Sequence, residues 1–327
     1  MQFQLELNIP PFQRQIEYTD DILLIGSCFT EHIADRLIQH KFKLLSNPHG
    51  ILFNPLSVAY SLDSYIDNKR YTEQDLFQLN ELWNSWDHHT RFSNIDKQAA
   101  LNGIDQAQEA AHNTIKKAGW VIITLGSAFQ YYLVDQNRPV ANNHRAPAQW
   151  FEKRLLTIDE INKGLSHAID KLIALNPGVN VMFTISPVRH IRDGVIENNR
   201  SKARLIEAVH EICGKYKNAC YFPAYELVID ILRDYRFYDI DFVHPNYMAT
   251  SFVWEQFLKA CMSTGTISIM QEVQDIMTAR NHRPRFQQTT AHQKFLSDYT
   301  KKTEALIKRF PYLDMNDELS FFRNEAV

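Results

Sequence analysis

Two polar segments, far apart in the chain, carry the residue types that nucleophilic catalysis needs. The first is Gly26-Ser27-Cys28-Phe29-Thr30, which follows the predicted strand 21–25, and the second is Asp241-Phe242-Val243-His244-Pro245. Acyl transfer requires a nucleophile, a base that takes its proton, and donors that stabilise an oxyanion. A thiol or hydroxyl at a strand-to-helix turn, together with a histidine close to an acid, therefore predicts an acyl-transfer enzyme.

The nucleophile is expected to be Cys28 or Ser27. The turn leads into the N-terminus of a helix, where backbone amides and the macrodipole favour an anion. We therefore expect a depressed pKa for the Cys28 thiol, since only the thiolate is strongly nucleophilic. The alternative for Cys28 is a small buried residue whose sulfur packs against the sheet. Ser27 supplies the nucleophile if the turn is rotated, and otherwise suits a helix N-cap.

His244 is the expected base. Asp241, three residues earlier, would orient the imidazole and stabilise its charged form, as in a catalytic triad. Asp239 is a nearby substitute for this acid, and a helix is expected to follow from about 246 to 262.

The strands and helices that position these residues are predicted from the pattern of apolar residues along the chain. Short apolar runs predict strands, and amphipathic stretches between them predict helices. The expected strands are 22–25, 43–46, 120–125, 179–185 and 219–222, and the expected helices are 30–40, 55–66, 104–118, 157–175 and 199–216. This alternation predicts a parallel sheet with helices on both faces. Right-handed crossovers would then bring the polar motifs to the carboxyl edge, where open α/β sheets bind ligands.

Three further segments interrupt or follow this pattern. Residues 67–103 are interpreted as an insertion or lid, and residues 134–156 as a non-repetitive loop. After residue 262 the strands cease, and helical patterns at 267–279 and 290–309 flank a break at Arg283-Pro284-Arg285. We therefore expect an α/β domain over 1–262 and a helical extension over 263–327 that packs on it or mediates self-association.

Composition excludes several classes of protein. The 327 residues are 45% hydrophobic and 22% charged with a net charge of −3, which predicts a packed core and no nucleic-acid footprint. The N-terminal residues do not resemble a signal peptide and no apolar run is long enough to cross a membrane, so a cytoplasmic protein without a membrane partner is expected. None of the four cysteines forms a C-x-x-C pair, so neither a zinc knuckle nor another metal site is expected.

The segment Gly26-Ser27-Cys28-Phe29 resembles the GSCFA-domain family, a bacterial group allied to the SGNH (GDSL-like) hydrolases. The resemblance covers roughly residues 20–260. It extends to Trp86-Asp87-His88-His89, Thr124-Leu125-Gly126-Ser127, Asn143-His144, Ser186-Pro187-Val188-Arg189-His190, Tyr221-Phe222-Pro223-Ala224-Tyr225-Glu226, Leu232-Arg233-Asp234-Tyr235-Arg236-Phe237-Tyr238, and Asp241 through Pro245. The resemblance implies a flavodoxin-like three-layer α/β/α fold and ester chemistry.

The four SGNH sequence blocks assign roles by resemblance. In the first block, Gly-Asp-Ser, the register places Cys28 rather than Ser27 at the nucleophile position. The glycine of the second block, whose amide serves the oxyanion hole, is Gly50. The asparagine of the third block is missing from Gly126-Ser127-Ala128, and Ser127, Asn143 and His144 are its candidate replacements. The Asp-x-x-His of the fourth block is complete.

Other polar residues are candidates for substrate contact. His88 and His89 would reach the substrate from the insertion, with a single metal ligand or a structural role as the alternatives, and His144 is a third candidate for substrate contact. Arg189 and His190, together with Arg192, follow the strand at 179–185 and could bind a carboxylate or phosphate, or instead form salt bridges with Asp193 or Glu197.

Three functions fit these motifs. The first is a cofactor-independent esterase that acts on a small-molecule or glycan ester through Cys28 or Ser27, His244 and Asp241. The second is an acyltransferase that uses a coenzyme A thioester as donor and a sugar or polyol as acceptor. The third is a non-catalytic binding module, which the missing asparagine of the third block favours.

Overall fold

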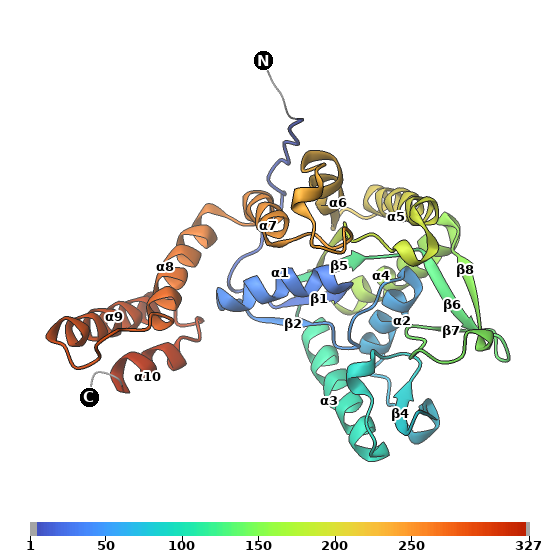
Figure 1. Ribbon diagram of the computed structural model, residues 1–327, viewed down its shortest axis with the longest axis horizontal. Helices are drawn as coiled ribbons and strands as arrows, with labels where there is room; N and C mark the ends of the chain where they lie inside the picture. The colour runs from blue at the N-terminus through green and yellow to red at the C-terminus, as the bar shows by residue number, and fades with distance from the viewer. Residues whose placement is uncertain (1–4, 325–327) are drawn as a thin grey trace.

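A five-stranded parallel sheet forms the centre of the protein (Figure 1). The computed structural model describes residues 5–324, and residues 1–4 and 325–327, the outer ends of the two expected domains, lie outside it. In spatial order the strands are β10 (Ala219–Tyr221), β9 (Asn180–Ile185), β5 (Trp120–Leu125), β1 (Ile22–Gly26) and β2 (Leu44–Ser46). The three central strands are buried along almost their whole length, as their continuous apolar runs predict.

Helices cover both faces of this sheet. In β1, Ile22 and Leu24 face the core shared with α1 (Cys28–Gln39) and α7 (Tyr247–Cys261). Leu23 and Ile25 face the opposite core, shared with α2 (Pro55–Ile66), α3 (Lys97–Ile115), α4 (Ile158–Leu175) and α5 (Val195–Lys215). Because successive strand residues point to opposite faces, this alternation buries the sheet on both sides. The expected three-layer α/β/α architecture is confirmed.

The strand order creates a switch point between β1 and β5. The chain adds β2 on one side of β1 and then crosses to β5, β9 and β10 on the other side. Open α/β sheets bind ligands outside the carboxyl ends of the strands at such a point. Gly26 ends β1 there with φ +144°, and a Cβ atom on it would lie 2.2 Å from the carbonyl oxygen of Thr124. Glycine is therefore needed for the close approach of the two strand ends.

The segment expected to be an insertion folds around a β-hairpin. It contains the hairpin β3 (Leu76–Leu79) and β4 (Leu82–Ser85), flanked by short 3-10 turns, η1 (Glu73–Asp75) and η2 (Thr90–Phe92). Helix α3 begins at Lys97, seven residues before the expected start, because the Asp96 side chain caps it by accepting from the Ala99 amide at 2.6 Å.

The expectation of a loop at 134–156 is wrong. Strands β6 (Phe129–Leu133), β7 (Arg138–Val140) and β8 (Phe151–Leu155) form a separate antiparallel sheet, with the 3-10 turn η3 (Ala148–Trp150) before β8. In β8 the residues alternate between partly buried and exposed. A strand that buries so little carries charged residues, which is why no apolar run marked it.

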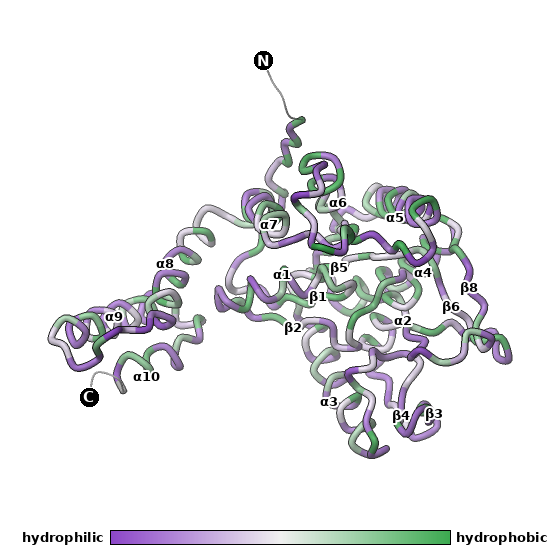
Figure 2. Tube along the Cα trace, viewed as in Figure 1, coloured by the Kyte–Doolittle hydropathy of each residue, from purple (hydrophilic) through white to green (hydrophobic). Residues whose placement is uncertain are grey.

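The connection from β10 to α7 contains α6 (Ala224–Glu226), the π-helical turn η5 (Leu227–Ile231) and the 3-10 turn η6 (Tyr235–Phe237). Three helices follow α7, namely α8 (Thr264–Arg280), α9 (Thr290–Arg309) and α10 (Asn316–Asn324), and they confirm the expected C-terminal helical extension (Figure 1). Hydrophobic and hydrophilic residues alternate along these helices, as burial of one side requires (Figure 2). Within residues 5–324, none of the helices combines the length and apolar character needed to span a bilayer.

Candidate functional site

The turn from β1 into α1 holds both candidate nucleophiles. Ser27 precedes the helix in extended conformation and is 1% exposed, and its hydroxyl oxygen has no hydrogen-bond partner. Ser27 is therefore the N-cap residue of α1 by position, as the alternative predicts, although its side chain makes no capping hydrogen bond. Cys28 is the first helical residue and is partly exposed. The thiol is thus the more accessible of the two nucleophiles.

The environment of Cys28 does not match the expected depressed pKa. Burial raises the pKa of the Cys28 thiol, and the nearby Glu31 carboxylate adds to this effect. The backbone amides of Phe29 and Cys28 and the ammonium group of Lys202 act in the opposite direction but do not overcome it. The loss of hydration outweighs the helix N-terminus, so the thiol is protonated at neutral pH and needs a base.

Asp241 and His244 form a closed hydrogen-bonded unit. One carboxylate oxygen of Asp241, Oδ1, accepts from the backbone amides of Val243 and His244, both at 3.0 Å. The other oxygen, Oδ2, lies 2.6 Å from His244 Nδ1. These bonds, those from the two amides foremost, lower the pKa of Asp241 to about 2, so the carboxylate stays ionised. Because a carboxylate only accepts, Nδ1 carries a proton, and in the neutral form of the ring Nε2 is the nitrogen with the lone pair.

Asp239, the alternative acid, has a different role. Its backbone amide donates to the carbonyl oxygen of His244 at 2.8 Å, and its carbonyl oxygen accepts from the Phe242 amide at 2.9 Å. Asp239 therefore closes the loop that carries His244, while Asp241 alone contacts the imidazole.

Loops after β1, β5 and β9 converge at the switch point. A Cβ atom on Gly126, after β5, would lie 3.4 Å from Ser27 Cβ and 3.3 Å from His190 Nε2. The amide of Arg189 donates to the carbonyl oxygen of Val243 at 3.4 Å, which joins the loop after β9 to the His244 loop. Within residues 5–324 no hydrogen bond links the Cys28 thiol to His244, and catalytic hydrogen bonds are often long before substrate binds.

His190 presents an unpartnered ring nitrogen at this edge. It is half-buried, its amide donates to the Asn198 side chain at 2.9 Å, and Nε2 has no hydrogen-bond partner. Burial lowers the pKa of His190 to about 4, so the ring is neutral at physiological pH. A neutral imidazole can donate to or accept from a substrate, but it does not supply the positive charge expected for an anionic group.

Arg189 does not form the salt bridges considered as alternatives. Asp193, in the 3-10 turn η4 (Ile191–Asp193), pairs with Lys153, and Glu197 pairs with Arg200 at 2.8 Å. The Arg189 guanidinium instead lies 5.4 Å from the centre of the Tyr238 ring. Its cation–π contact helps to hold the segment before Asp241.

Sequence reasoning missed Lys202. This lysine of α5 is 1% exposed, and its Nζ donates to the carbonyl oxygens of Gly126 at 2.7 Å and Ser186 at 2.6 Å. Burial lowers the pKa of Lys202 to about 7. The signal was present, because Lys202 lies on the same helical face as the buried Leu205 and Val209, where a lysine is unexpected.

The expected oxyanion residues Gly50, Ser127 and Asn143 all form hydrogen bonds within turns. The Gly50 amide donates to the carbonyl oxygen of Asn47 at 2.7 Å. The Ser127 hydroxyl accepts from the Phe129 amide at 3.2 Å, and the Asn143 side chain accepts from the Arg145 amide at 3.2 Å. In this structure the Gly50 amide is therefore engaged in a turn, and Ser127 and Asn143 use their oxygens as acceptors in turns.

Comparison with protein families identifies the chain. The model of the GSCFA family matches residues 21–257, and that of the GSCFA domain protein, C-terminal domain, matches residues 273–326. The chain belongs to the GSCFA family. A search of curated proteins gives no match. The first GSCFA segment contains both Cys28 and His244, and the second covers the C-terminal part of α8 and all of α9 and α10.

In this GSCFA protein, two of the histidines expected to contact substrate are buried and pack against other residues of the protein. His88 is 1% exposed, stacks on His49 with the ring centres 4.1 Å apart, and lies 2.9 Å from the Ser85 hydroxyl. His144 is 7% exposed, and its Nε2 donates to the Ser85 carbonyl oxygen at 2.7 Å. The expectation of substrate contact for His88 and His144 is therefore wrong, because tertiary packing encloses both rings.

His89 has a different environment from its neighbour. It is partly exposed, its Nδ1 accepts from the Arg91 amide at 3.3 Å, and its amide donates to the His49 carbonyl oxygen at 2.8 Å. A Cβ atom on Gly50, which has φ +80°, would lie 2.1 Å from His89 Cβ. Glycine at position 50 thus lets the insertion pack directly on the loop after β2, and His89 remains a candidate for substrate contact.

The stacked histidines predict loss of stability in acid. Burial lowers the pKa of His49 and His88 well below the usual value. Below about pH 6.5 these two histidines bind protons in the unfolded state but not in the folded state. The free energy of unfolding therefore falls as the pH falls. We expect His88→Asn to recover about 1–2 kcal/mol of the loss between pH 7 and pH 5. Urea unfolding at both pH values measures this slope.

His167→Asn is the matched control, since His167 on α4 is exposed. It should leave the slope of the free energy of unfolding against pH unchanged. Equal losses in wild type and His88→Asn would show that the stack is not the acid-sensitive element.

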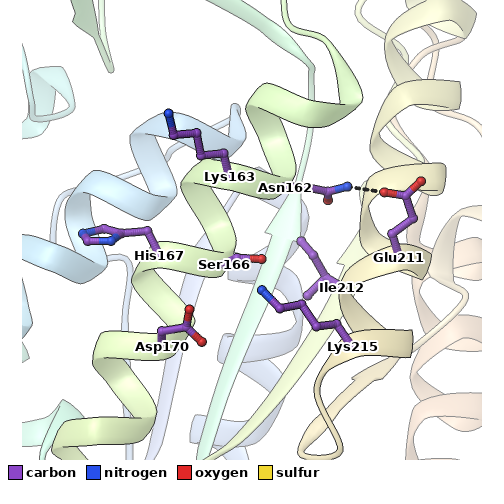
Figure 3. A pocket seen from close by; sticks show the side chains of 8 residues that line it. All are labelled: Asn162, Lys163, Ser166, His167, Asp170, Glu211, Ile212 and Lys215. Atoms are coloured by element: carbon purple, nitrogen blue, oxygen red, sulfur yellow. Dashed lines mark hydrogen bonds between the residues drawn. The ribbon is translucent and has the colours of Figure 1, made fainter.

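The GSCFA protein also has a polar hollow between α4 and α5 (Figure 3). It is lined by Asn162, Lys163, Ser166, His167, Asp170, Glu211, Ile212 and Lys215. Although it contains Ser166, His167 and Asp170, these do not form a triad, because His167 lies 3.8 Å from Asp63 and Asp170 accepts from the Tyr216 hydroxyl at 2.7 Å. Within residues 5–324 no group of three His, Cys, Asp or Glu side chains is placed to hold a metal ion.

Proposed function

We propose that the protein is an acyl-transfer enzyme that cleaves ester bonds, with Cys28 as nucleophile, His244 as base and Asp241 as the acid that orients it. The observation that carries the proposal is the Asp241–His244 pair, in which Asp241 Oδ2 lies 2.6 Å from His244 Nδ1. The loop that carries this pair is hydrogen-bonded to the loop after β9, at the edge of the sheet where β1 leads into Cys28. The resemblance to the first, second and fourth sequence blocks of SGNH hydrolases supports the same reaction class. A small-molecule or glycan ester is the proposed substrate class, with no cofactor.

The proposed reaction begins with proton transfer. His244 Nε2 takes the Cys28 proton as the sulfur attacks the ester carbonyl carbon, forming a carbon–sulfur bond and a tetrahedral oxyanion. When the intermediate collapses, the carbon–oxygen bond breaks and the imidazolium returns the proton to the leaving alcohol. Water then attacks the thioester with His244 again as base, which releases the acid and restores the thiol.

The raised pKa of Cys28 gives His244 its importance in this scheme. A cysteine that ionises readily in the free enzyme needs little help from a base, whereas a half-buried protonated thiol needs one at the moment of attack. The amides of Cys28 and Phe29, which favour negative charge on the sulfur, lie at the N-terminus of α1 and are the proposed donors closest to the developing oxyanion.

Cys28 is preferred over Ser27 because of access. The Ser27 hydroxyl is enclosed, with 1% of the residue exposed, while Cys28 reaches the surface of the turn. An acyl donor could approach the sulfur without moving the turn, but it could reach the hydroxyl only after a rearrangement.

Acylation mapped by mass spectrometry tests the proposal. Treatment with a p-nitrophenyl ester panel is expected to acylate Cys28 in the wild type and in Ser27→Ala, and to leave Cys28→Ala unlabelled. In His244→Ala the acylation rate should fall about 10²- to 10⁴-fold, because the general base is lost. Cys213→Ala, which removes a half-buried thiol on α5, is the control and should react like the wild type.

The remaining outcomes separate the alternatives. Acylation of Ser27 would overturn the assignment of Cys28. Absence of label on both residues would contradict catalysis and favour a binding module. A label that persists until an alcohol is added would assign acyl transfer to that alcohol rather than hydrolysis.

A further inference from the structure

Asn47 continues the hydrogen bonding of β1 beyond the end of β2. The parallel pairing of the two strands ends at Leu24 and Ser46, and the Asn47 amide then donates to the Leu24 carbonyl oxygen at 2.8 Å. With φ +46° at Asn47 the backbone leaves the extended conformation. The Asn47 side chain takes its place, because Oδ1 accepts from the Gly26 amide at 2.8 Å. The amide of the last residue of β1, two residues before Cys28, is therefore bonded to a side chain rather than to a neighbouring strand.

The left-handed backbone alone does not explain an asparagine at position 47. Asn47 is 1% exposed, and among the described residues its Nδ2 has no hydrogen-bond partner. A buried N–H group without a partner costs free energy. Glycine adopts a positive φ equally well and does not carry this group. The bond from the Gly26 amide to Oδ1 is the contribution that glycine would lack.

The position of Gly26 determines where the nucleophile turn points. The amides of Cys28 and Phe29 begin α1, and they stabilise an oxyanion only if they are directed at the substrate carbonyl oxygen. Gly26 has φ +144°, and a glycine has no side chain that would restrict its backbone to one conformation. Hydrogen bonds must therefore fix the turn, and the bond to Asn47 is one of them.

Asn47 is itself held by the insertion. Its backbone carbonyl oxygen accepts from the Gly50 amide at 2.7 Å, which closes the turn after β2, and from the guanidinium group of Arg91. Arg91 lies in the 3-10 turn η2 and is exposed. One side of Asn47 thus contacts the insertion and the other contacts Gly26, so a surface residue of the insertion is linked to the nucleophile turn through a single residue.

We propose that Asn47 is the positioning residue of the nucleophile turn: its side chain holds the Gly26 amide, and Arg91 of the insertion holds Asn47 in place. The proposal rests on the proposed function for the role of Cys28 as nucleophile. Asn47 contacts no substrate in this scheme. It directs the Cys28 sulfur, and the amides that begin α1, toward the ester carbonyl group.

Asn47→Gly removes the side chain without straining the backbone, since glycine adopts the same positive φ. Amide hydrogen exchange at Gly26 reports the lost bond directly and should become at least about tenfold faster. We expect kcat for p-nitrophenyl ester cleavage to fall about 10- to 100-fold with KM within about threefold of the wild type, because alignment is lost while substrate contacts remain.

Alkylation of Cys28 by iodoacetamide should change in the opposite direction to kcat. Digestion and mass spectrometry report Cys28 separately from the other three cysteines. A turn that is no longer held exposes its half-buried thiol, so alkylation in Asn47→Gly should be about two- to fivefold faster than in the wild type. Opposite changes in alkylation and ester cleavage indicate lost alignment rather than a blocked or unreactive sulfur.

Arg91→Met tests the link to the insertion in a variant that changes only an exposed side chain. It should show the same pattern at smaller size, with kcat about three- to tenfold lower and faster exchange at Gly26. Its matched control is Arg154→Met, which removes an exposed arginine that donates to Asn137 at 3.1 Å. Asn218→Gly is the control for Asn47→Gly, because its Nδ2 donates to the Val179 carbonyl oxygen at 2.8 Å, at the amino edge of the sheet. Both controls should keep the wild-type kcat, exchange at Gly26 and alkylation rate.

Unchanged exchange at Gly26 in a folded Asn47→Gly variant would overturn the proposal, and so would faster exchange without any change in Cys28 alkylation. Equal changes in Asn218→Gly would assign the effect to a general loss of stability and would overturn it as well. If Asn47→Gly does not fold, Arg91→Met decides by the same two readouts. Exchange and alkylation need no ester cleavage, so a protein without acyl-transfer activity would contradict the proposed function while these two measurements still decide the role of Asn47.

Discussion

Replacement of Asp241 by asparagine is expected to lower ester cleavage about 10²- to 10⁴-fold while the protein stays folded. An asparagine can still accept the Val243 and His244 amides through its carbonyl oxygen. Its NH₂ group would then face His244 Nδ1, where the carboxylate oxygen now lies at 2.6 Å. The imidazole would have to accept at Nδ1 and carry its proton on Nε2, so it could not take the proton of Cys28.

The measurement is kcat/KM for a p-nitrophenyl ester against pH, with circular dichroism to check the fold. Asp239→Asn is the matched control, since Asp239 contacts the His244 loop only through its backbone. It should keep activity within about threefold of the wild type. Similar losses in both variants, or full activity in Asp241→Asn, would contradict the role of the Asp241 carboxylate.

The sequence predicts those parts of the fold whose signals are local. The run Ile22 to Ile25 is apolar without interruption because both faces of β1 are covered, and this marks a central strand unambiguously. The contact of Asp241 with His244 needs only a three-residue turn, so the motif alone was sufficient to predict it. The strands β7 and β8 carry no such signal, because an exposed antiparallel sheet uses polar residues.

Properties that depend on distant segments could not be predicted in the same way. The pKa of Cys28 is raised because other segments of the protein bury the thiol. The sequence shows that a helix begins at this position, but it does not show how deeply the thiol is buried. Likewise, His88 and His89 are adjacent, yet one is enclosed by His49 and the other remains partly exposed. Lys202 is the exception, because its place on an apolar helical face was visible in the sequence.

A fully buried carboxylate helps to join the C-terminal helices to the α/β domain. Glu318, on α10, is 0% exposed and lies 2.9 Å from Lys41 Nζ, in the turn between α1 and β2. The same carboxylate also pairs with Arg280 at the end of α8. Glu318 thus connects the last helix both to the helical extension and to the domain that carries Cys28.

Replacement of Glu318 by alanine is expected to destabilise the protein by about 3–5 kcal/mol, because it leaves two cations without their shared partner and a space in the interface. Chemical denaturation measures the change, and limited proteolysis should show earlier cleavage in α8 to α10 than in the α/β domain. Glu304→Ala removes an exposed carboxylate that pairs with Arg323 on α10 at 2.6 Å, and should cost less than about 1 kcal/mol. If both variants lost equal stability, Glu318 would not be the connection that secures the helices, and the apolar contacts of α8 and α10 would have to supply it.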